Sequence, residues 1–303
     1  MIRTFFISMG LAAGIAAPAY ANLNIFACEP EWGALAHEIG GEKVSIYTAT
    51  TGLQDPHQVQ ARPSLIAKAR AADLAVCTGA ELEIGWLPMI QQETSNGKIA
   101  GGSAGFFEAA SFLTLAEIPT ALDRAQGDIH AAGNPHIQTD PRNVLAVAGQ
   151  LAERMAQLDS ANAAYYRAQY AAFAPRFTAA IAKWQMQAAP LRGTPVLVEH
   201  HSWIYLENWL GLIRIAALEP KPGVPASSGY LAGILATVQK TPAKMIVRAA
   251  YEDDRPSQFI AGKTGIPVVT LPFTVGGDDQ AKDLYSLYDD TIQRLLAGAK
   301  AAK

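Results

Sequence analysis

Strand and helix patterns alternate along this chain in two separate rounds, with a long helical stretch between them. In the first round, short apolar runs such as 24–27 and 73–77 alternate with helical patterns such as 31–39 and 82–92, and a further helix is predicted over 141–158. The second round begins with the apolar run 196–199 and ends with a helical pattern over 280–296. Such alternation predicts parallel sheets with helices on both faces. We therefore expect an α/β protein with two Rossmann-like lobes.

The stretch between the two rounds predicts a long helix that joins the lobes. It is rich in alanine, and its aromatic side chains recur at helical spacing. Pro175 lies inside it and should kink the helix, because proline lacks an N–H group and crowds the preceding turn. We expect an N-terminal lobe over 22–158, a linking helix over 159–190 and a C-terminal lobe over 191–303. The Gly-rich stretch 93–133 is expected to be a surface loop or a lid.

The first residues have the pattern of a secretory signal peptide. Arg3 supplies a positive charge, residues 5–17 are apolar, and Ala19-Tyr20-Ala21 fits a cleavage site with small residues. We expect a signal peptide over 1–21 and a mature protein in the periplasm. A rival interpretation remains open, because residues 25–28 weakly resemble a lipoprotein processing box and would place a lipid anchor on Cys28.

The chain has two cysteines, Cys28 and Cys77. Each stands at the end of a predicted strand, and neighbouring parallel strands would bring the two together. In an exported protein such an even pair predicts a disulfide more often than a reactive thiol.

The charge balance and the motifs exclude several classes of function. The net charge is −3 and no basic run occurs, so no nucleic-acid partner is expected. The sequence contains no HExxH helix motif and no phosphate loop, and the Gly-x-Ser-x-Gly spacing at 101–105 lies in a Gly-rich stretch and not between a predicted strand and a predicted helix. We therefore expect a binding protein and not an enzyme, with a zinc-dependent metallohydrolase as the alternative.

Three of the six histidines stand at corresponding positions in the two lobes. His57 and His136 follow prolines in loops, and His200 directly follows a predicted strand. Ligands of open α/β sheets bind at the carboxyl ends of the strands, so these three residues should face one cleft. Neutral imidazoles bind zinc at ~2.0–2.1 Å, and three of them can hold one ion. We expect His37 to be an ordinary helix residue and His130 to satisfy a turn.

With these residues, the chain resembles the substrate-binding proteins of ABC transporters that import zinc and manganese, known as cluster A-I. The resemblance covers nearly the whole mature chain. Its most specific motifs are Asp55-Pro56-His57, Gly79-Ala80-Glu81-Leu82-Glu83, Asn134-Pro135-His136 and His200-His201-Ser202-Trp203. Zinc-binding members often carry a long loop rich in histidine and acidic residues, and this resemblance does not extend to such a loop.

The resemblance implies a metal site between the lobes. It assigns His57, His136 and His200 as ligands, with His200 preferred over His201 because Ser and Trp follow it at two and three positions. Many relatives have a carboxylate after the last strand. Here the first acid after that strand is Asp278, so the fourth ligand is expected to be Asp278 or a water molecule.

The expected function is capture of a metal ion and its delivery to the membrane permease of an ABC importer. Three imidazoles favour Zn²⁺ as the cargo, whereas Mn²⁺ prefers oxygen donors. The protein is expected to be a monomer, and a metallochaperone is a further partner to consider. A receptor for a metal chelate is an alternative with the same architecture.

Overall fold

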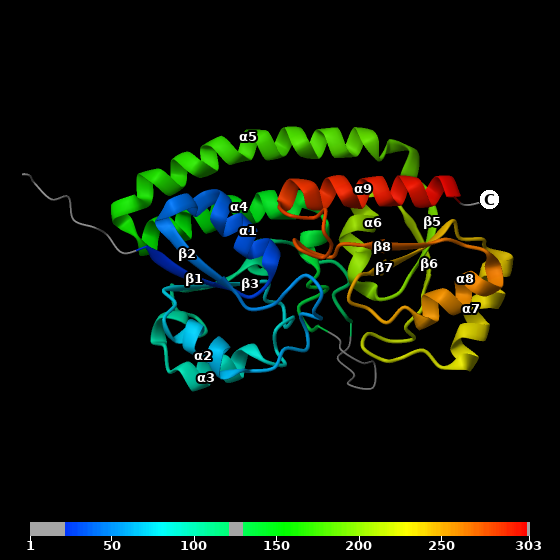
Figure 1. Cartoon of the computed structure of the whole chain (residues 1–303), viewed down its shortest axis with the longest axis horizontal. Coiled ribbons are helices and arrows are strands. Elements are labelled where there is room, and N and C mark those ends of the chain that lie inside the picture. The colour runs from blue at the N-terminus through cyan, green and yellow to red at the C-terminus, as the bar shows by residue number, and fades with distance from the viewer. Residues whose placement is uncertain (1–21, 121–129, 302–303) are drawn as a thin grey trace, which may run out of the picture.

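The chain folds into two parallel sheets, one in each half (Figure 1). The structure is a computed structural model that describes residues 22–120 and 130–301, so the predicted signal peptide lies outside the described residues. The first sheet has the order β2 (Val44–Thr48), β1 (Leu23–Ala27), β3 (Leu74–Cys77) and β4 (Phe106–Glu108). The second has the equivalent order β6 (Ile213–Ala217), β5 (Pro195–Val198), β7 (Met245–Ala249) and β8 (Val268–Leu271). The predicted fold class is confirmed.

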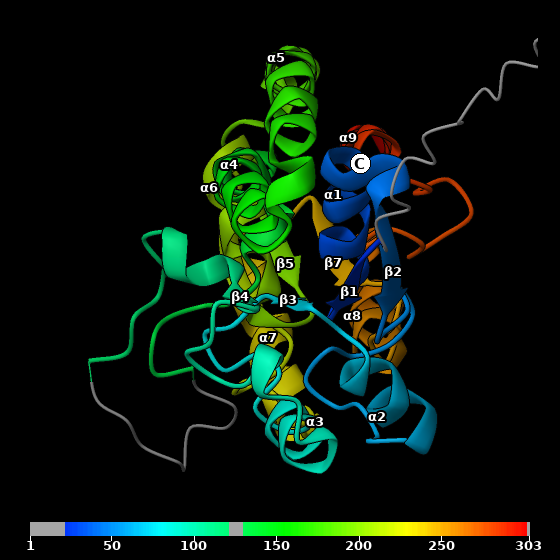
Figure 2. The same cartoon turned by 90° about the vertical axis from the view of Figure 1, so that its left-hand side faces the viewer.

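Helices cover both faces of each sheet. The first lobe contains α1 (Pro30–Gly40), α2 (Pro63–Arg70), α3 (Leu87–Thr94) and α4 (Pro141–Leu158). The second lobe contains α6 (Ile204–Leu210), α7 (Ser228–Lys240), α8 (Arg255–Thr264) and α9 (Leu284–Ala301). Figure 2 shows α2 and α3 on one side of the first sheet and α1 and α4 on the other. None of the helices in 22–120 and 130–301 is both long and apolar enough to cross a membrane.

The central strand β1 shows how the sequence builds these layers. Successive side chains of a strand point to opposite faces. Ile25 and Ala27 accordingly pack in the core with α1 and α4, whereas Phe26 packs with α2 and α3. Because both faces are covered, the strand reads as a nearly continuous apolar run, as expected for a parallel sheet.

The long helix α5 (Ala163–Gln187) runs across both lobes, as Figure 1 shows, with Pro175 inside it. Its buried side chains form one stripe at helical spacing: Tyr166, Phe173, Phe177, Ile181 and Trp184. Helix α9 lies beside it, and the Trp184 indole donates a hydrogen bond to Asp289 of α9 (2.7 Å). The Tyr288 hydroxyl of α9 also donates to the carbonyl oxygen of Gln138 in the first lobe (2.6 Å). The division into 22–158, 159–190 and 191–303 stays a prediction.

Three local predictions differ from the structure. Side-chain hydrogen bonds set a later start for two helices, and one strand is too short to be predicted from the sequence pattern. The helix predicted over 82–92 begins at Leu87, since Glu83 accepts hydrogen bonds from the N–H groups of Thr78 and Gly79 and closes a turn. The helix predicted over 280–296 begins at Leu284, where Asp283 accepts from the N–H of Ser286. Strand β4, with three residues, lies inside the stretch expected to be a loop.

The predicted disulfide between Cys28 and Cys77 is present. Both residues are completely buried, and each directly follows or ends a central strand, as expected from the sequence. The bond occupies the Cys28 sulfur that a lipid anchor would need, so the structure does not fit the lipoprotein interpretation.

Three carboxyl groups of the first lobe are buried together: Glu29, Glu31 and Glu83. Burial raises the pKa of Glu31 and of Glu83 to about 7, and that of Glu29 well above its ordinary value. Thr274, from the segment after β8, donates a hydrogen bond to Glu31. This contact joins the two lobes, and it is made to a carboxyl group that holds its proton at mildly acidic pH.

Replacing Glu31 with glutamine should change the dependence of stability on pH. Between pH 4.5 and about 7 the unfolded chain loses the Glu31 proton while the folded chain keeps it, so the free energy of unfolding falls as the pH rises. A shift of this size corresponds to roughly 3 kcal/mol above pH 7. The neutral amide avoids this cost and still accepts the hydrogen bond from Thr274. Glu31→Gln should therefore gain stability relative to the wild type by up to roughly 3 kcal/mol between pH 4.5 and 8.

Urea unfolding of the metal-free proteins at pH 4.5 and at pH 8 measures this gain. The variant Glu42→Gln, at an exposed position, is the control. A stability difference between wild type and Glu31→Gln that is the same at both pH values contradicts the prediction.

Candidate metal site

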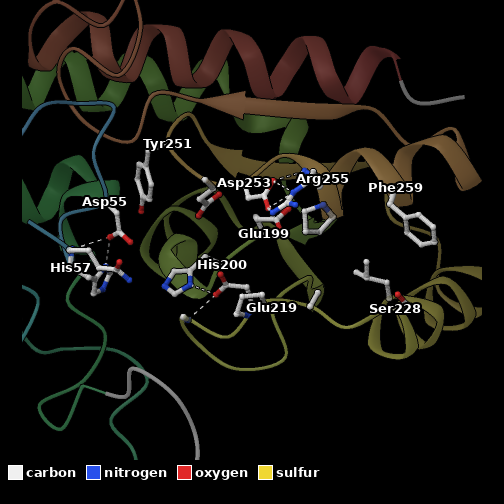
Figure 3. A pocket seen from close by; sticks show the side chains of 17 residues that line it. Asp55, His57, Glu199, His200, Glu219, Ser228, Tyr251, Asp253, Arg255 and Phe259 are labelled. Carbon is white, nitrogen blue, oxygen red and sulfur yellow. Dashed lines mark hydrogen bonds and ion pairs between the residues drawn. The ribbon is translucent and has the colours of Figure 1, made fainter.

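Three of the predicted ligands meet at the carboxyl edges of the two sheets. His57 lies in the loop after β2, His136 in the segment before α4, and His200 two residues after the end of β5. Each offers one ligand atom, and these atoms all lie within 4.8 Å of one another. Figure 3 shows His57 on the first lobe and His200 on the second, facing the same space. The structure therefore brings together side chains that are far apart in the sequence.

Each of the three rings presents its Nδ1 atom to a side-chain oxygen. The pairs are His57 with Asp55 (2.8 Å), His136 with Asn134 (2.8 Å) and His200 with Glu219 (2.6 Å). An oxygen that accepts from Nδ1–H fixes the tautomer and leaves the lone pair on Nε2. The three rings are thus prepared to donate electron pairs from Nε2, which is what a metal ion requires.

The Asp-Pro-His and Asn-Pro-His motifs hold their histidines by the same pair of hydrogen bonds. The side-chain oxygen of Asp55 accepts from the backbone N–H of His57 (2.9 Å) as well as from its ring. The side-chain oxygen of Asn134 does the same for His136 (3.1 Å to the backbone nitrogen). The sequence drew attention to the prolines before His57 and His136, and these two acceptors were missed. Their signal is an Asp or Asn two positions before the histidine, the spacing of an Asx turn.

His136 is the most buried of the three, with 1% of its surface exposed. Burial, followed by the neighbouring His57 and His200 rings, holds the pKa of His136 well below its usual value. Its Nε2 meets no hydrogen-bond partner in the part of the chain that the structure describes. A buried polar atom without a partner is costly. A neutral imidazole with a free lone pair in a closed site fits a metal ion.

The structure does not bring Asp278 to the histidines. Its carboxylate forms an ion pair with Arg294 of α9 (2.7 Å) and accepts from the backbone N–H groups of Gln280 and Ala281. The ring of Phe273, which follows β8, instead lies 5.7 Å from the His136 ring. After the last strand, an aromatic ring and not the expected carboxylate therefore lies beside His136.

Two further histidines lie nearby. His201 faces Arg214 (2.9 Å from Nδ1), which supports the choice of His200 as the ligand. His130 was expected to satisfy a turn, and its carbonyl does accept from the N–H of Gly133. Its ring, however, lies beside the cluster, with Nε2 3.3 Å from Nε2 of His57.

A cleft of about 650 Å³ extends from His57 and His200 along the second lobe. Its wall near the histidines is acidic, and its far end carries Phe259 (Figure 3). Burial raises the pKa of Glu199 and of Glu252 in this wall to about 8. His57 and His200 thus lie at one end of a cleft much larger than an ion.

The fold and the site can be compared with known proteins. The family model for the zinc-uptake complex component A, described as periplasmic, matches residues 25–298. The chain therefore belongs to this family of substrate-binding proteins of metal ABC transporters.

Curated relatives are distant but extend over most of the chain. The metal ABC transporter substrate-binding lipoprotein SloC of Streptococcus mutans is 20% identical over 268 residues, which are 87% of this chain and 85% of the relative. The manganese ABC transporter substrate-binding lipoprotein PsaA of Streptococcus pneumoniae is 18% identical over 87% of this chain and 84% of the relative.

Solved structures share the fold. A zinc-bound deletion mutant of ZnuA has a TM-score of 0.76 at 23% identity and covers 93% of this chain and 99% of that one. The protein FpvC of Pseudomonas aeruginosa, in complex with Mn²⁺, has a TM-score of 0.74 at 17% identity, with 92% and 98% covered.

Proposed function

We propose that this protein captures a Zn²⁺ ion between its lobes in the periplasm and delivers it to the permease of an ABC importer. The observation that carries the proposal is the arrangement of His57, His136 and His200, whose Nδ1 atoms are held by oxygens and whose ligand atoms gather within 4.8 Å. The cargo is bound and released without chemical turnover. The protein acts as a monomer, and a metallochaperone is a further partner.

The donor atoms support zinc over manganese. Imidazole nitrogens suit zinc, whereas manganese prefers carboxylate, carbonyl and water oxygens. The carboxylate expected as a fourth ligand, Asp278, is engaged by Arg294, which leaves an unusually nitrogen-rich site.

The site also suggests how loading is signalled. His57 and His136 belong to the first lobe and His200 to the second, so an ion that binds all three ties the lobes together. Helix α5 runs across both lobes, which limits the motion to a small closure. Because a ligand shifts the equilibrium only through its preference for one state, the permease must recognise this closed form.

A competition titration tests the proposed cargo. The metal-free mature protein should bind one Zn²⁺ per chain and bind Mn²⁺ more weakly by roughly 100-fold or more, as expected for nitrogen donors. Affinities are measured against a chromophoric chelator. Equal or tighter binding of Mn²⁺ would overturn the assignment of zinc, and failure to bind any divalent ion would overturn the receptor function.

The large cleft supports a second candidate, a receptor for a metal chelate. Its volume of about 650 Å³ and its lining by Tyr251, Arg255 and Phe259 suit an organic ligand bound beside the ion. Native mass spectrometry of protein isolated from its host distinguishes the two. A mass increase equal to one bare ion supports the first candidate, and a larger one supports the chelate.

A further inference from the structure

The position of His130 matches that of an additional metal ligand. Its Nε2 lies 3.3 Å from Nε2 of His57. Two nitrogens bound to one tetrahedral zinc ion at ~2.0–2.1 Å are separated by about 3.3–3.4 Å. His57 and His130 are therefore already at the separation of two ligands of a single ion.

Backbone groups of a turn hold the other side of the His130 ring. The backbone of Ala80 and Glu81 hydrogen-bonds to the His130 ring as an acceptor. The Glu81 carboxylate also accepts from the N–H of Ala131 (2.7 Å). Ala80 and Glu81 both have positive φ (50° and 67°), a conformation that non-glycine residues rarely adopt. Such strain is often retained where it positions a functional group.

The facing nitrogens of His57 and His130 are placed to share one cation. The Nδ1 hydrogen of His57 is directed to Asp55, so its Nε2 offers a lone pair towards His130. In the metal-free protein an Nε2–H of His130 can donate to this lone pair, since the two nitrogens lie 3.3 Å apart. A metal ion that takes the place of this hydrogen, with the hydrogen moved to Nδ1 of His130, is bound by both nitrogens.

We propose that His130 is the fourth ligand and completes an all-imidazole site with His57, His136 and His200. The inference rests on the proposed function of the same site. Asp278 is not available, since Arg294 holds it. His130 lies outside the group whose atoms are all within 4.8 Å of one another. Metal binding therefore includes a small shift of its ring towards His136 and His200.

This ligand set has two consequences for the cargo. With no carboxylate ligand, the site discriminates against ions that prefer oxygen, such as Mn²⁺. Three of the four ligands belong to the first lobe, so this lobe holds the ion before His200 of the second lobe joins it.

Zinc-edge X-ray absorption of the loaded protein counts the imidazoles. We expect four in the wild type and three in His130→Ala, and a zinc affinity lower by roughly 100-fold or more in the variant, as for the loss of one of four ligands. His130→Asp should recover much of the zinc affinity and bind Mn²⁺ more tightly than the wild type does. The exposed His37→Ala is the matched control and should keep four imidazoles and the wild-type affinity.

The outcomes separate the two proposals. A wild type that binds zinc through three imidazoles, with an unchanged affinity in His130→Ala, overturns the role of His130 and leaves the receptor function standing. A wild type that binds no zinc overturns both. Circular dichroism shows that each variant is folded before its affinity is compared.

Discussion

Replacing His136 with alanine should lower the zinc affinity by roughly 100- to 1,000-fold. Four-ligand zinc sites bind with about 10–16 kcal/mol, so one ligand contributes roughly 3–4 kcal/mol. Each 1.4 kcal/mol is about a factor of ten in affinity. His136 is the most buried of the three clustered rings, and its Nε2 has no partner among the described residues.

The same substitution should leave the metal-free fold intact. It removes an unpartnered Nε2, but also the hydrogen bond between Nδ1 and Asn134 and the volume of a buried ring, so the metal-free variant should stay folded and unfold at a lower temperature than the wild type. The affinity is measured by competition with a chelator, and His37→Ala, on the exposed side of α1, is the control. An affinity within threefold of the wild type would remove His136 from the ligand set and, with it, the main support for the site.

Removing the disulfide should destabilise the protein by about 4 kcal/mol, the value that the chain-entropy relation gives for cysteines separated by 49 residues. The double variant Cys28→Ala/Cys77→Ala tests this effect. Alanine avoids leaving buried hydroxyl groups without partners at two completely buried positions. Urea unfolding of the metal-free protein gives the free energy of unfolding for both forms.

The zinc affinity of the folded double variant serves as the control. The two cysteines lie in the core of the first lobe, among side chains of β1, α2 and α3, and contact none of the proposed ligands. We therefore expect an affinity close to that of the wild type. A loss of stability below about 1 kcal/mol would mean that the unfolded chain is already restricted in this region.

The elements that could be predicted from the sequence are those with a clear period or boundary. The helix expected over 141–158 has these bounds in the structure, because Pro141 begins it and Asp140 accepts from the N–H of Arg142 at its first turn. The three clustered histidines were also predictable, since each follows a strand or a turn motif whose place in a parallel sheet is known.

The features that were missed depend on contacts between distant segments. Whether Asp278 reaches the site depends on Arg294, which lies on a helix that begins after it. Whether His130 reaches the site depends on the turn at Ala80 and Glu81, about fifty positions earlier in the sequence. Strand β4 has only three residues, too few to show an alternation. Neither the secondary-structure propensity of a segment nor the spacing of its residues predicts contacts between distant segments.

Helix α9, near the C-terminus, forms hydrogen bonds with the first lobe and with the long helix α5. The Tyr288 hydroxyl holds the carbonyl of Gln138, two residues after His136, while Asp289 on the same helix holds Trp184 of α5. The final helix therefore stabilises the position of the segment that carries the proposed zinc ligand His136. We therefore expect that removing this helix weakens metal binding at a site in the opposite lobe.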